Sequence, residues 1–205
     1  MATRILVLSD INSVQKKKWA IGLSKNGYKI GIFSFNGPET NWYKEYDIDC
    51  LHKPSIVKSS NKFIAKLAYI AFLPKVIAVI KEFQPDILHA HYASSYGLLG
   101  ALTGFHPYII SAWGTDVMRF PHINFITKQI IMFNLRSADS ICATSYTIKK
   151  HIRQFTNKKV EVIPFGVDLK EFVNRKSFDK DDSAFTIGCT KALEKLYNIN
   201  ALILS

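Results

Sequence analysis

The length and composition of this chain are those of a folded globular protein. Its 205 residues are 48% hydrophobic and 21% charged, which excludes a disordered chain and allows one good core but not two full domains of ordinary size. The 27 lysine and arginine residues exceed the 16 aspartate and glutamate residues, and the net charge of +11 predicts attraction to anions: nucleotide phosphates, anionic lipid head groups or nucleic acid.

The first elements follow the order of a Rossmann-like fold. Short apolar runs predict strands over 4–9 and 28–35, and helical spacing predicts a helix over 14–25 between them. The loop over 9–14 contains no glycine. Dinucleotide sites need glycines there for a tight turn and a close approach to pyrophosphate, so the sequence argues against an NAD or FAD enzyme. The lysines at 16–18 are expected on a solvated helix face.

The segment 61–83 is the longest helical candidate and has two interpretations. Lysines and Pro74 interrupt its apolar residues, which excludes a transmembrane span. One interpretation is an interfacial helix that makes peripheral contact with an anionic membrane. The other is a helix that packs on the sheet with its lysines in water, and we favour it because the apolar residues cover more than a narrow stripe.

The central stretch predicts a strand, a helix and a second parallel strand, over 87–91, 95–102 and 108–112. In an open parallel sheet the carboxyl ends of the strands meet at one edge, and ligands bind there. Polar and aromatic residues follow both strands and form a candidate site: His89, His91, Tyr92, Ser94 and Ser95 after the first, and Trp113, Gly114, Thr115 and Asp116 after the second.

Each of these loops also has a purely structural interpretation. Ser94 or Ser95 would then only cap a helix, and residues 114–116 would only turn the chain. Two adjacent loops rich in histidine, tryptophan and aspartate favour a site instead. His89 and His91 share one face of a strand, but no third metal ligand is in view, so we expect buried, hydrogen-bonded histidines.

The rest of the chain continues the alternation and then enters a second domain. The expected elements are a helix over 121–136, a strand over 140–144, a helix over 146–155 and a strand over 159–164. A charged connector follows over 169–183, and then a strand over 184–189 and a helix over 191–204. A lone strand and helix cannot form a core, so we expect a second domain cut short at Ser205.

Three segments together resemble the amino-terminal half of retaining glycosyltransferases of family 4, which have the GT-B fold. They are the run Pro-Asp-Ile-Leu-His-Ala-His at 85–91, the turn Trp-Gly-Thr-Asp at 113–116, and the strand ending in Pro-Phe-Gly-Val-Asp at 160–168, followed by Phe172. The third segment is similar to the interdomain signature of that family. The resemblance therefore implies a Rossmann-like, doubly wound parallel α/β sheet over 1–168, a connector over 169–183 and an incomplete donor-binding domain over 184–205.

The resemblance also implies an activity. Such an enzyme transfers a sugar from a nucleotide diphosphate sugar to a surface-glycan acceptor, either a polysaccharide or a lipid-linked saccharide. Helix N-termini such as the one expected near Ser94 would supply positive charge for the departing diphosphate, so no cofactor and no metal are expected. We expect little or no transfer by these 205 residues alone. The alternatives are a non-catalytic acceptor-binding or membrane-docking module and a GT-B sugar-nucleotide epimerase.

The placement expected for this protein is cytoplasmic, with peripheral contact at the inner face of the plasma membrane through 61–83. Cys50, Cys142 and Cys189 are widely spaced and odd in number, a pattern that suits reduced thiols in a cytosol. The apolar run at 5–8 is too short for the core of a signal peptide. Neither a nucleic-acid motif nor a basic stripe interleaved with aromatic residues is present, so no nucleic-acid partner is expected.

The resemblance assigns roles by position in the motifs. Asp116 and His91 are the catalytic candidates, which would orient the acceptor, and Trp113 would wall the sugar site, where many family members have a histidine. The loop over 10–14 also departs from the family, because it lacks the glycines that approach the donor phosphate. The other expected site residues are Gly114, Thr115, Ser94, Ser95 and Tyr92 for substrate, Lys191 and Lys195 for donor phosphate, and Gly166 and Asp168 for the hinge, the last as a structural cap.

Overall fold

A computed structural model describes residues 2–52, 68–167, 169, 188–190 and 198–204 of the chain. The chain divides into two compact units, Met1–Gly166 and Val167–Ser205. In the second unit the described residues include one short helix, α8 (Ile199–Leu204). The strand predicted over 184–189 and most of the helix predicted over 191–204 lie outside the described residues.

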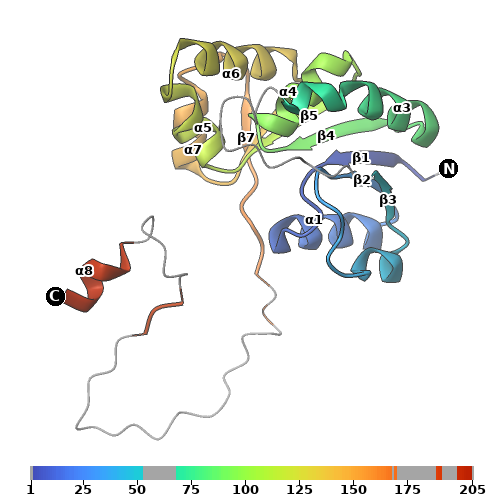
Figure 1. Ribbon diagram of the computed structural model, residues 1–205, viewed down its shortest axis with the longest axis horizontal. Helices are drawn as coiled ribbons and strands as arrows, with labels where there is room; N and C mark the ends of the chain where they lie inside the picture. Colours follow the sequence, from blue (N-terminus) through green and yellow to red (C-terminus); the bar gives the residue numbers. More distant parts are fainter. Residues whose placement is uncertain (1, 53–67, 168, 170–187, 191–197, 205) are drawn as a thin grey trace, which may run out of the picture. The chain divides into compact units, whose positions relative to one another are not determined.

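A parallel sheet forms the centre of the first unit (Figure 1). In the described part of the chain it has seven strands, in the order β3-β2-β1-β4-β5-β6-β7, and every neighbouring pair is parallel. The strands are β1 (Arg4–Leu8), β2 (Lys29–Phe33), β3 (Asp49–His52), β4 (Ile87–His91), β5 (Tyr108–Ala112), β6 (Ser140–Ala143) and β7 (Val160–Val162). The sheet grows outward from β1 in one direction and from β4 in the other, so the order reverses between these two strands. This is the doubly wound arrangement, and it confirms the predicted fold class.

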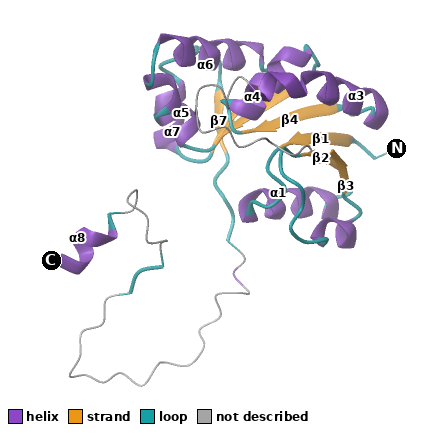
Figure 2. Cartoon of the chain, viewed as in Figure 1, coloured by secondary structure: helices purple, strands orange, loops and turns teal. Residues whose placement is uncertain are grey.

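Helices cover both faces of the sheet (Figure 2). In the described residues of the first unit the α-helices are α1 (Val14–Lys25), α3 (Leu73–Phe83), α4 (Ser95–Thr103), α5 (Thr115–Met118), α6 (Phe125–Ser137) and α7 (Tyr146–Ile152). The same residues also form the short 3-10 helices η1 (Trp42–Tyr46), η2 (Ala68–Phe72) and η3 (Phe120–His122). Parallel strands need such crossover connections, because the chain must return to the same end of the sheet before each new strand begins.

The strand β1 separates two hydrophobic cores, because successive side chains of a strand point to opposite faces. Leu6 and Leu8 belong to the larger core, with residues of α3, α4 and α6. Ile5 and Val7 belong to the smaller core, with Ala20 of α1 and residues of η1. A strand buried on both faces reads as a continuous apolar run in the sequence, which is why this strand was predictable.

The helix predicted over 61–83 is confirmed over Leu73–Phe83 and differs from the structure over 68–72. A 3-10 turn, η2, precedes an α-helix that begins at Leu73, with Pro74 in the first turn. Proline has no amide hydrogen to donate and clashes with the preceding turn, so it begins helices instead of continuing them. Val76 and Val79 are buried in the larger core, so this part packs on the sheet. Peripheral membrane contact through 61–83 stays a prediction, since 53–67 lie outside the described residues.

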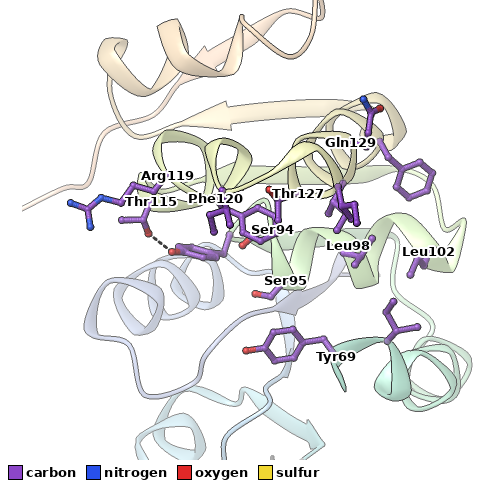
Figure 3. A pocket seen from close by; sticks show the side chains of 16 residues that line it. Tyr69, Ser94, Ser95, Leu98, Leu102, Thr115, Arg119, Phe120, Thr127 and Gln129 are labelled. Carbon is purple, nitrogen blue, oxygen red and sulfur yellow. Dashed lines mark hydrogen bonds between the residues drawn. The ribbon is translucent and has the colours of Figure 1, made fainter. Parts of the chain in front are cut away.

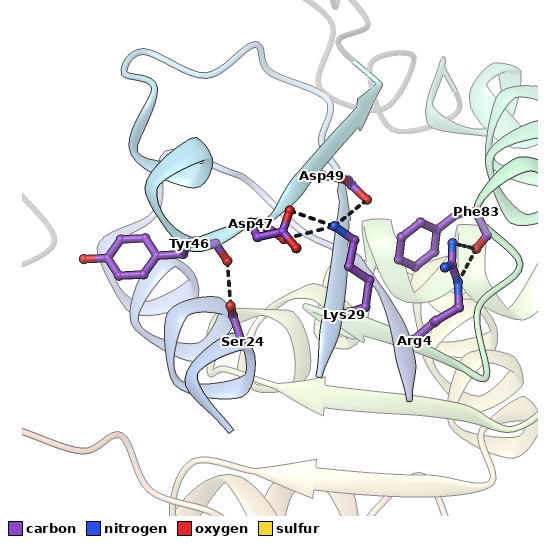
Figure 4. A network of polar contacts seen from close by, with 7 residues as sticks. All are labelled: Arg4, Ser24, Lys29, Tyr46, Asp47, Asp49 and Phe83. Atoms are coloured by element: carbon purple, nitrogen blue, oxygen red, sulfur yellow. Dashed lines mark hydrogen bonds and ion pairs between the residues drawn. The ribbon is translucent and has the colours of Figure 1, made fainter. Parts of the chain in front are cut away.

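The amino ends of the strands carry polar groups that bind one another (Figure 4). The Arg4 guanidinium donates through Nε to the Phe83 carbonyl oxygen at 2.7 Å. The Lys29 ammonium lies 3.0 Å from a carboxylate oxygen of Asp47 and 3.4 Å from one of Asp49. These contacts hold the start of β1 to the end of α3 and the start of β2 to the start of β3, so the hydrogen bonds of these groups stabilise the fold. The opposite edge of the sheet is different.

A glycine in α4 allows the helix to approach β5 closely. A Cβ atom on Gly100 would lie 2.5 to 2.6 Å from three atoms of the Tyr108 side chain. That ring is buried, and its hydroxyl donates to the Gly97 carbonyl oxygen at 2.7 Å. Gly100→Ala is therefore expected to lower the free energy of unfolding by about 2 kcal/mol, measured by urea denaturation. The control is Gly22→Ala in α1, where a Cβ meets nothing within 4 Å and stability is expected to rise by up to about 1 kcal/mol. Equal effects would contradict the steric explanation.

Candidate functional site

The carboxyl edge of the sheet brings the predicted site residues together. The strands β1, β4 and β5 lie side by side in register, with Leu8 opposite Ala90 and His91 opposite Ser111. The loops that follow these three strands therefore adjoin one another. The helix α4 begins at Ser95 with Ser94 as its N-cap, as predicted, although the Ser94 side chain makes no capping hydrogen bond.

Asp116 joins two of these loops. Its side chain is only 1% exposed. Its carboxylate accepts hydrogen bonds from the amides of Ala93 at 2.7 Å, Gly114 at 2.7 Å and Trp113 at 3.1 and 3.2 Å. Burial raises the pKa of the Asp116 carboxyl, and these backbone hydrogen bonds oppose that rise. Both oxygens are occupied by backbone amides, so these contacts hold the loop after β4 against the loop after β5.

The loop after β4 is fixed from several sides. Tyr92 has a φ of 94°, a conformation uncommon outside glycine, and its amide donates to the Ser111 carbonyl oxygen at 2.9 Å. The Tyr92 hydroxyl forms a short hydrogen bond with the Thr115 hydroxyl. Asn134 of α6, which the sequence analysis did not single out, donates to the Ala93 carbonyl oxygen at 2.9 Å and is fully buried. An asparagine among apolar residues of a predicted helix was the signal that could have found it. A residue with an unfavourable φ, held in place by surrounding hydrogen bonds, is found most often in functional loops.

The two histidines of β4 are in contact, with ring centroids 4.5 Å apart. The His89 ring is hydrogen-bonded to the Ser111 hydroxyl at 2.8 Å, as expected. The expectation is wrong for His91, because neither of its ring nitrogens has a hydrogen-bond partner in the described part of the chain. Burial lowers the pKa of His89 to about 4. Burial, followed by the charges of His89 and Lys16, lowers the pKa of His91 well below its usual value. Both imidazoles are therefore neutral near pH 7.

Lys16 was expected on a solvated helix face, and this expectation is wrong. Its ammonium nitrogen lies 5.9, 5.6 and 5.3 Å from the ring centroids of Tyr92, Tyr96 and Trp113. Burial lowers the pKa of the Lys16 ammonium. Trp19, one turn further along α1, packs its ring at 5.7 Å from both histidine rings. Residues three apart on a helix share a face, and this face of α1 covers the candidate site.

An apolar pocket of about 680 Å³ opens beside the same loops (Figure 3). Tyr92, Ser94, Ser95 and Thr115, all predicted site residues, line it together with side chains of η2, α4, η3 and α6. Its apolar lining includes several partly exposed side chains that were not among the predicted site residues: Ile70, Leu98, Leu102, Ile123, Ile126, Ile130 and Phe133. A concave apolar surface with a few polar groups at one end is typical of a ligand site.

The remaining predicted site residues lie elsewhere. Gly166 is exposed after the last strand of the sheet. Asp168, Lys191 and Lys195 lie outside the described residues. Within the described ranges, no three His, Cys, Asp or Glu side chains are grouped closely enough to hold a metal ion. No helix in those ranges is both long and apolar enough to cross a membrane.

A family model described as glycosyl transferase 4-like matches residues 4–145. The chain belongs to the glycosyl transferase 4-like family. The resemblance drawn from the sequence motifs is therefore confirmed, and two of the three motifs, at 85–91 and 113–116, lie inside the matched range. The carboxyl edge described above lies within it as well.

Two curated relatives are similar to parts of the chain. TuaC of Bacillus subtilis, assigned as a teichuronic acid biosynthesis glycosyltransferase, is 25% identical over 95 residues, which are 45% of this chain and 24% of the relative. Alpha-monoglucosyldiacylglycerol synthase of Streptococcus pneumoniae is 25% identical over 161 residues, which are 73% of this chain and 36% of the relative. The chain thus spans about a quarter to a third of the length of these relatives.

Two solved structures share the fold. Sucrose-phosphate synthase from Thermosynechococcus elongatus superposes with a TM-score of 0.66 at 13% identity, covering 82% of this chain and 49% of that chain. A glycosyltransferase from Rickettsia africae superposes with a TM-score of 0.60 at 19% identity, covering 90% of this chain and 46% of that chain. At such identities the likeness concerns the fold alone.

Proposed function

We propose that this protein is a glycosyltransferase that moves a sugar from a nucleotide diphosphate sugar to a lipid-linked surface-glycan acceptor. The observation that carries the proposal is the apolar pocket, because it ends at Tyr92 and Thr115, beside the carboxyl edge of the sheet. The pocket would hold the lipid chain, while the saccharide reaches the polar loops. The name of one relative, alpha-monoglucosyldiacylglycerol synthase, describes a lipid product.

The chemistry of sugar transfer requires an acceptor hydroxyl held firmly against the anomeric carbon. The fixed loops after β4 and β5 supply that rigidity, because Asp116 accepts hydrogen bonds from an amide in each of the two loops. We assign the contact with the acceptor to the neutral His91 ring and the wall of the sugar site to Trp113, whose rings lie 5.2 Å apart. Asp116 then acts through the loops it positions.

The parts of the site beyond the sheet belong to the same proposal. Gly166 and Asp168 would form the hinge, and 169–183 would connect it to a donor-binding domain that begins at 184. Lys191 and Lys195 would bind the donor phosphate there. The protein would work in the cytoplasm, at the inner face of the membrane that holds its lipid acceptor.

The proposal that the pocket binds the lipid chain is tested by placing a charged side chain in its lining. Ile126 is 54% exposed and lines the pocket, so Ile126→Asp is expected to weaken binding of a lipid-linked saccharide by about tenfold. The adjacent Phe125 is 73% exposed and is not among the lining residues, so Phe125→Asp is the matched control and is expected to change binding by less than about twofold. Titration calorimetry with a short-chain glucosyl diacylglycerol measures both. Equal weakening by both variants would contradict a lipid site in the pocket. The same would follow if the wild-type protein bound the free saccharide as tightly as the lipid-linked saccharide.

Transfer itself is followed with labelled nucleotide diphosphate sugars and the same lipid acceptor. The 205 residues alone are expected to yield little or no labelled glycolipid, and a labelled glycolipid is the expected product once they are joined to a complete donor-binding domain. A labelled sugar nucleotide of altered configuration, with the lipid left unlabelled, would identify a GT-B epimerase instead.

A further inference from the structure

One face of α1 presents a lysine to the candidate site. The Lys16 ammonium lies within 6 Å of three aromatic ring centroids, those of Tyr92, Tyr96 and Trp113. Within the described ranges, no hydrogen bond and no ion pair within 4.0 Å engages it. An ammonium has three N–H donors. The aromatic rings attract its positive charge, but they offer no oxygen or nitrogen atom to accept those hydrogen bonds. The side chain is therefore a cation with unused donors at the edge of the sheet.

Two further polar groups beside Lys16 are also without partners. His91 is 1% exposed, and neither of its ring nitrogens is hydrogen-bonded in the described residues. The indole Nε1 of Trp113 is likewise buried without a partner in that part of the chain. The Trp113 ring lies 5.2 Å from the His91 ring and 5.3 Å from the Lys16 ammonium. Buried polar groups are nearly always hydrogen-bonded, so unsatisfied donors and acceptors grouped around a cation are candidate contacts for a ligand.

The charges around this cluster favour an anion. The first turn of α1 contains no acidic residue, and the Ser13 side chain makes no capping hydrogen bond there, so the positive end of the helix dipole is uncompensated at that turn. Asp10 and Asp116 are the acidic groups that act on Lys16. The Asp116 oxygens are occupied by backbone amides, and Asp10 accepts from the Asn12 amide at 3.2 Å.

We propose that Lys16, with His91 and Trp113, forms a binding site for a phosphate group of a substrate. The loop after β1 has no glycine, so the backbone cannot approach a phosphate closely there, and a side-chain cation takes over that contact. The identity of the phosphate rests on the proposed function, which offers two sources: the diphosphate of the sugar donor and a phosphate between lipid and saccharide in the acceptor. The Tyr92 ring lies 5.9 Å from the Lys16 ammonium and also lines the apolar pocket, so the two candidate sites share this residue.

The test is an anion titration followed by tryptophan fluorescence, since Trp19 and Trp113 both lie at the site. The probes are inorganic diphosphate, uridine diphosphate and dihexanoyl phosphatidic acid. Lys16→Gln is expected to weaken binding by about tenfold or more, because a charged hydrogen bond is lost. Lys18→Gln removes the same charge from the same helix and is expected to change binding by less than about twofold. Lys16→Arg keeps the charge and is expected to restore most of the affinity.

The outcomes are separable. A preference for uridine diphosphate assigns the site to the donor, and a preference for phosphatidic acid assigns it to the acceptor. Equal losses in Lys16→Gln and Lys18→Gln, or no binding of any probe by the folded wild-type chain, would overturn the proposal. If Lys16→Gln fails to fold, Lys16→Arg is compared with the wild type at increasing salt and at increasing pH. Both proteins should bind the anion, and both should bind it more weakly as the salt concentration rises. Only the wild type should lose binding at high pH, because its lysine deprotonates and arginine does not. Inorganic diphosphate carries neither sugar nor lipid, so its binding, unchanged in Ile126→Asp, stands even if the proposed function fails.

Discussion

Asp116→Ala is expected to lower the free energy of unfolding by about 3 kcal/mol or more, because three backbone amides would lose a buried carboxylate acceptor. Those amides belong to Ala93, Trp113 and Gly114, and they lie in two different loops. Urea denaturation followed by circular dichroism measures the change. Asp116→Asn keeps the shape and one carbonyl oxygen, so its loss should be smaller, although its NH₂ group would face an amide donor.

A carboxylate at the opposite, amino edge of the sheet serves as the control, because Asp139 directly precedes β6 and binds the first residue of β5. One Asp139 oxygen accepts from the Tyr108 amide at 2.6 Å and contacts His106 Nδ1 at 2.7 Å, but the Asp139 side chain is 46% exposed. Water can replace these hydrogen bonds, so Asp139→Ala is expected to cost only about 1 kcal/mol. If both alanine variants cost the same, burial is not what makes the Asp116 contacts strong.

Acid is expected to destabilise the folded chain through the histidines of β4. The pKa of His89 is lowered to about 4 by burial, whereas a histidine in the unfolded chain titrates near about 6.5. Between these values the unfolded state binds the proton and the folded state does not. The stability contributed by the neutral ring is therefore fully present above about pH 6.5 and is lost as the pH falls toward about 4, by roughly 3 kcal/mol for His89 alone. The pKa of His91 is also lowered, and its effect has the same sign.

The measurement is the midpoint of urea unfolding at several pH values between about 7 and about 4. His89→Gln removes one titrating ring and should flatten the curve in this window. The exposed His122 provides the control, and His122→Gln should leave the slope as it is in the wild type. A wild-type midpoint that does not change with pH in this window would contradict the burial of neutral rings.

The apolar pocket shows why part of the site could not be predicted from the sequence. Its walls come from η2, α4, η3 and α6, which are distant in the chain and adjoin only after the helices pack on one face of the sheet. The side chains that line it, such as Leu98 and Ile126, follow the same helical spacing as core residues. Periodicity shows which residues lie on one face, but it does not show whether a neighbouring helix covers that face.

Asp116 and Lys16 show the same limit for single residues. The Gly-Thr-Asp turn was recognisable as part of a site, but its carboxylate binds the Ala93 amide, which lies 23 residues away in the chain. Lys16, Lys17 and Lys18 point in different directions from α1, and only Lys16 among them faces the Trp113 ring. No local sequence pattern distinguishes it from its two neighbours. Such partners are chosen by the packing of α1 and the register of β4 with β5.

The sequence by itself determined the parallel α/β fold, the grouping of the candidate site residues at its carboxyl edge and the glycosyl transferase 4-like family. These follow from local patterns: apolar runs for buried strands, helical spacing between them, and motifs at the strand ends. Only the tertiary structure decided that Asp116 holds two loops together, that His91 lacks a partner, and that Lys16 faces them. Those properties depend on contacts between segments far apart in the chain, which form only when the sheet is assembled.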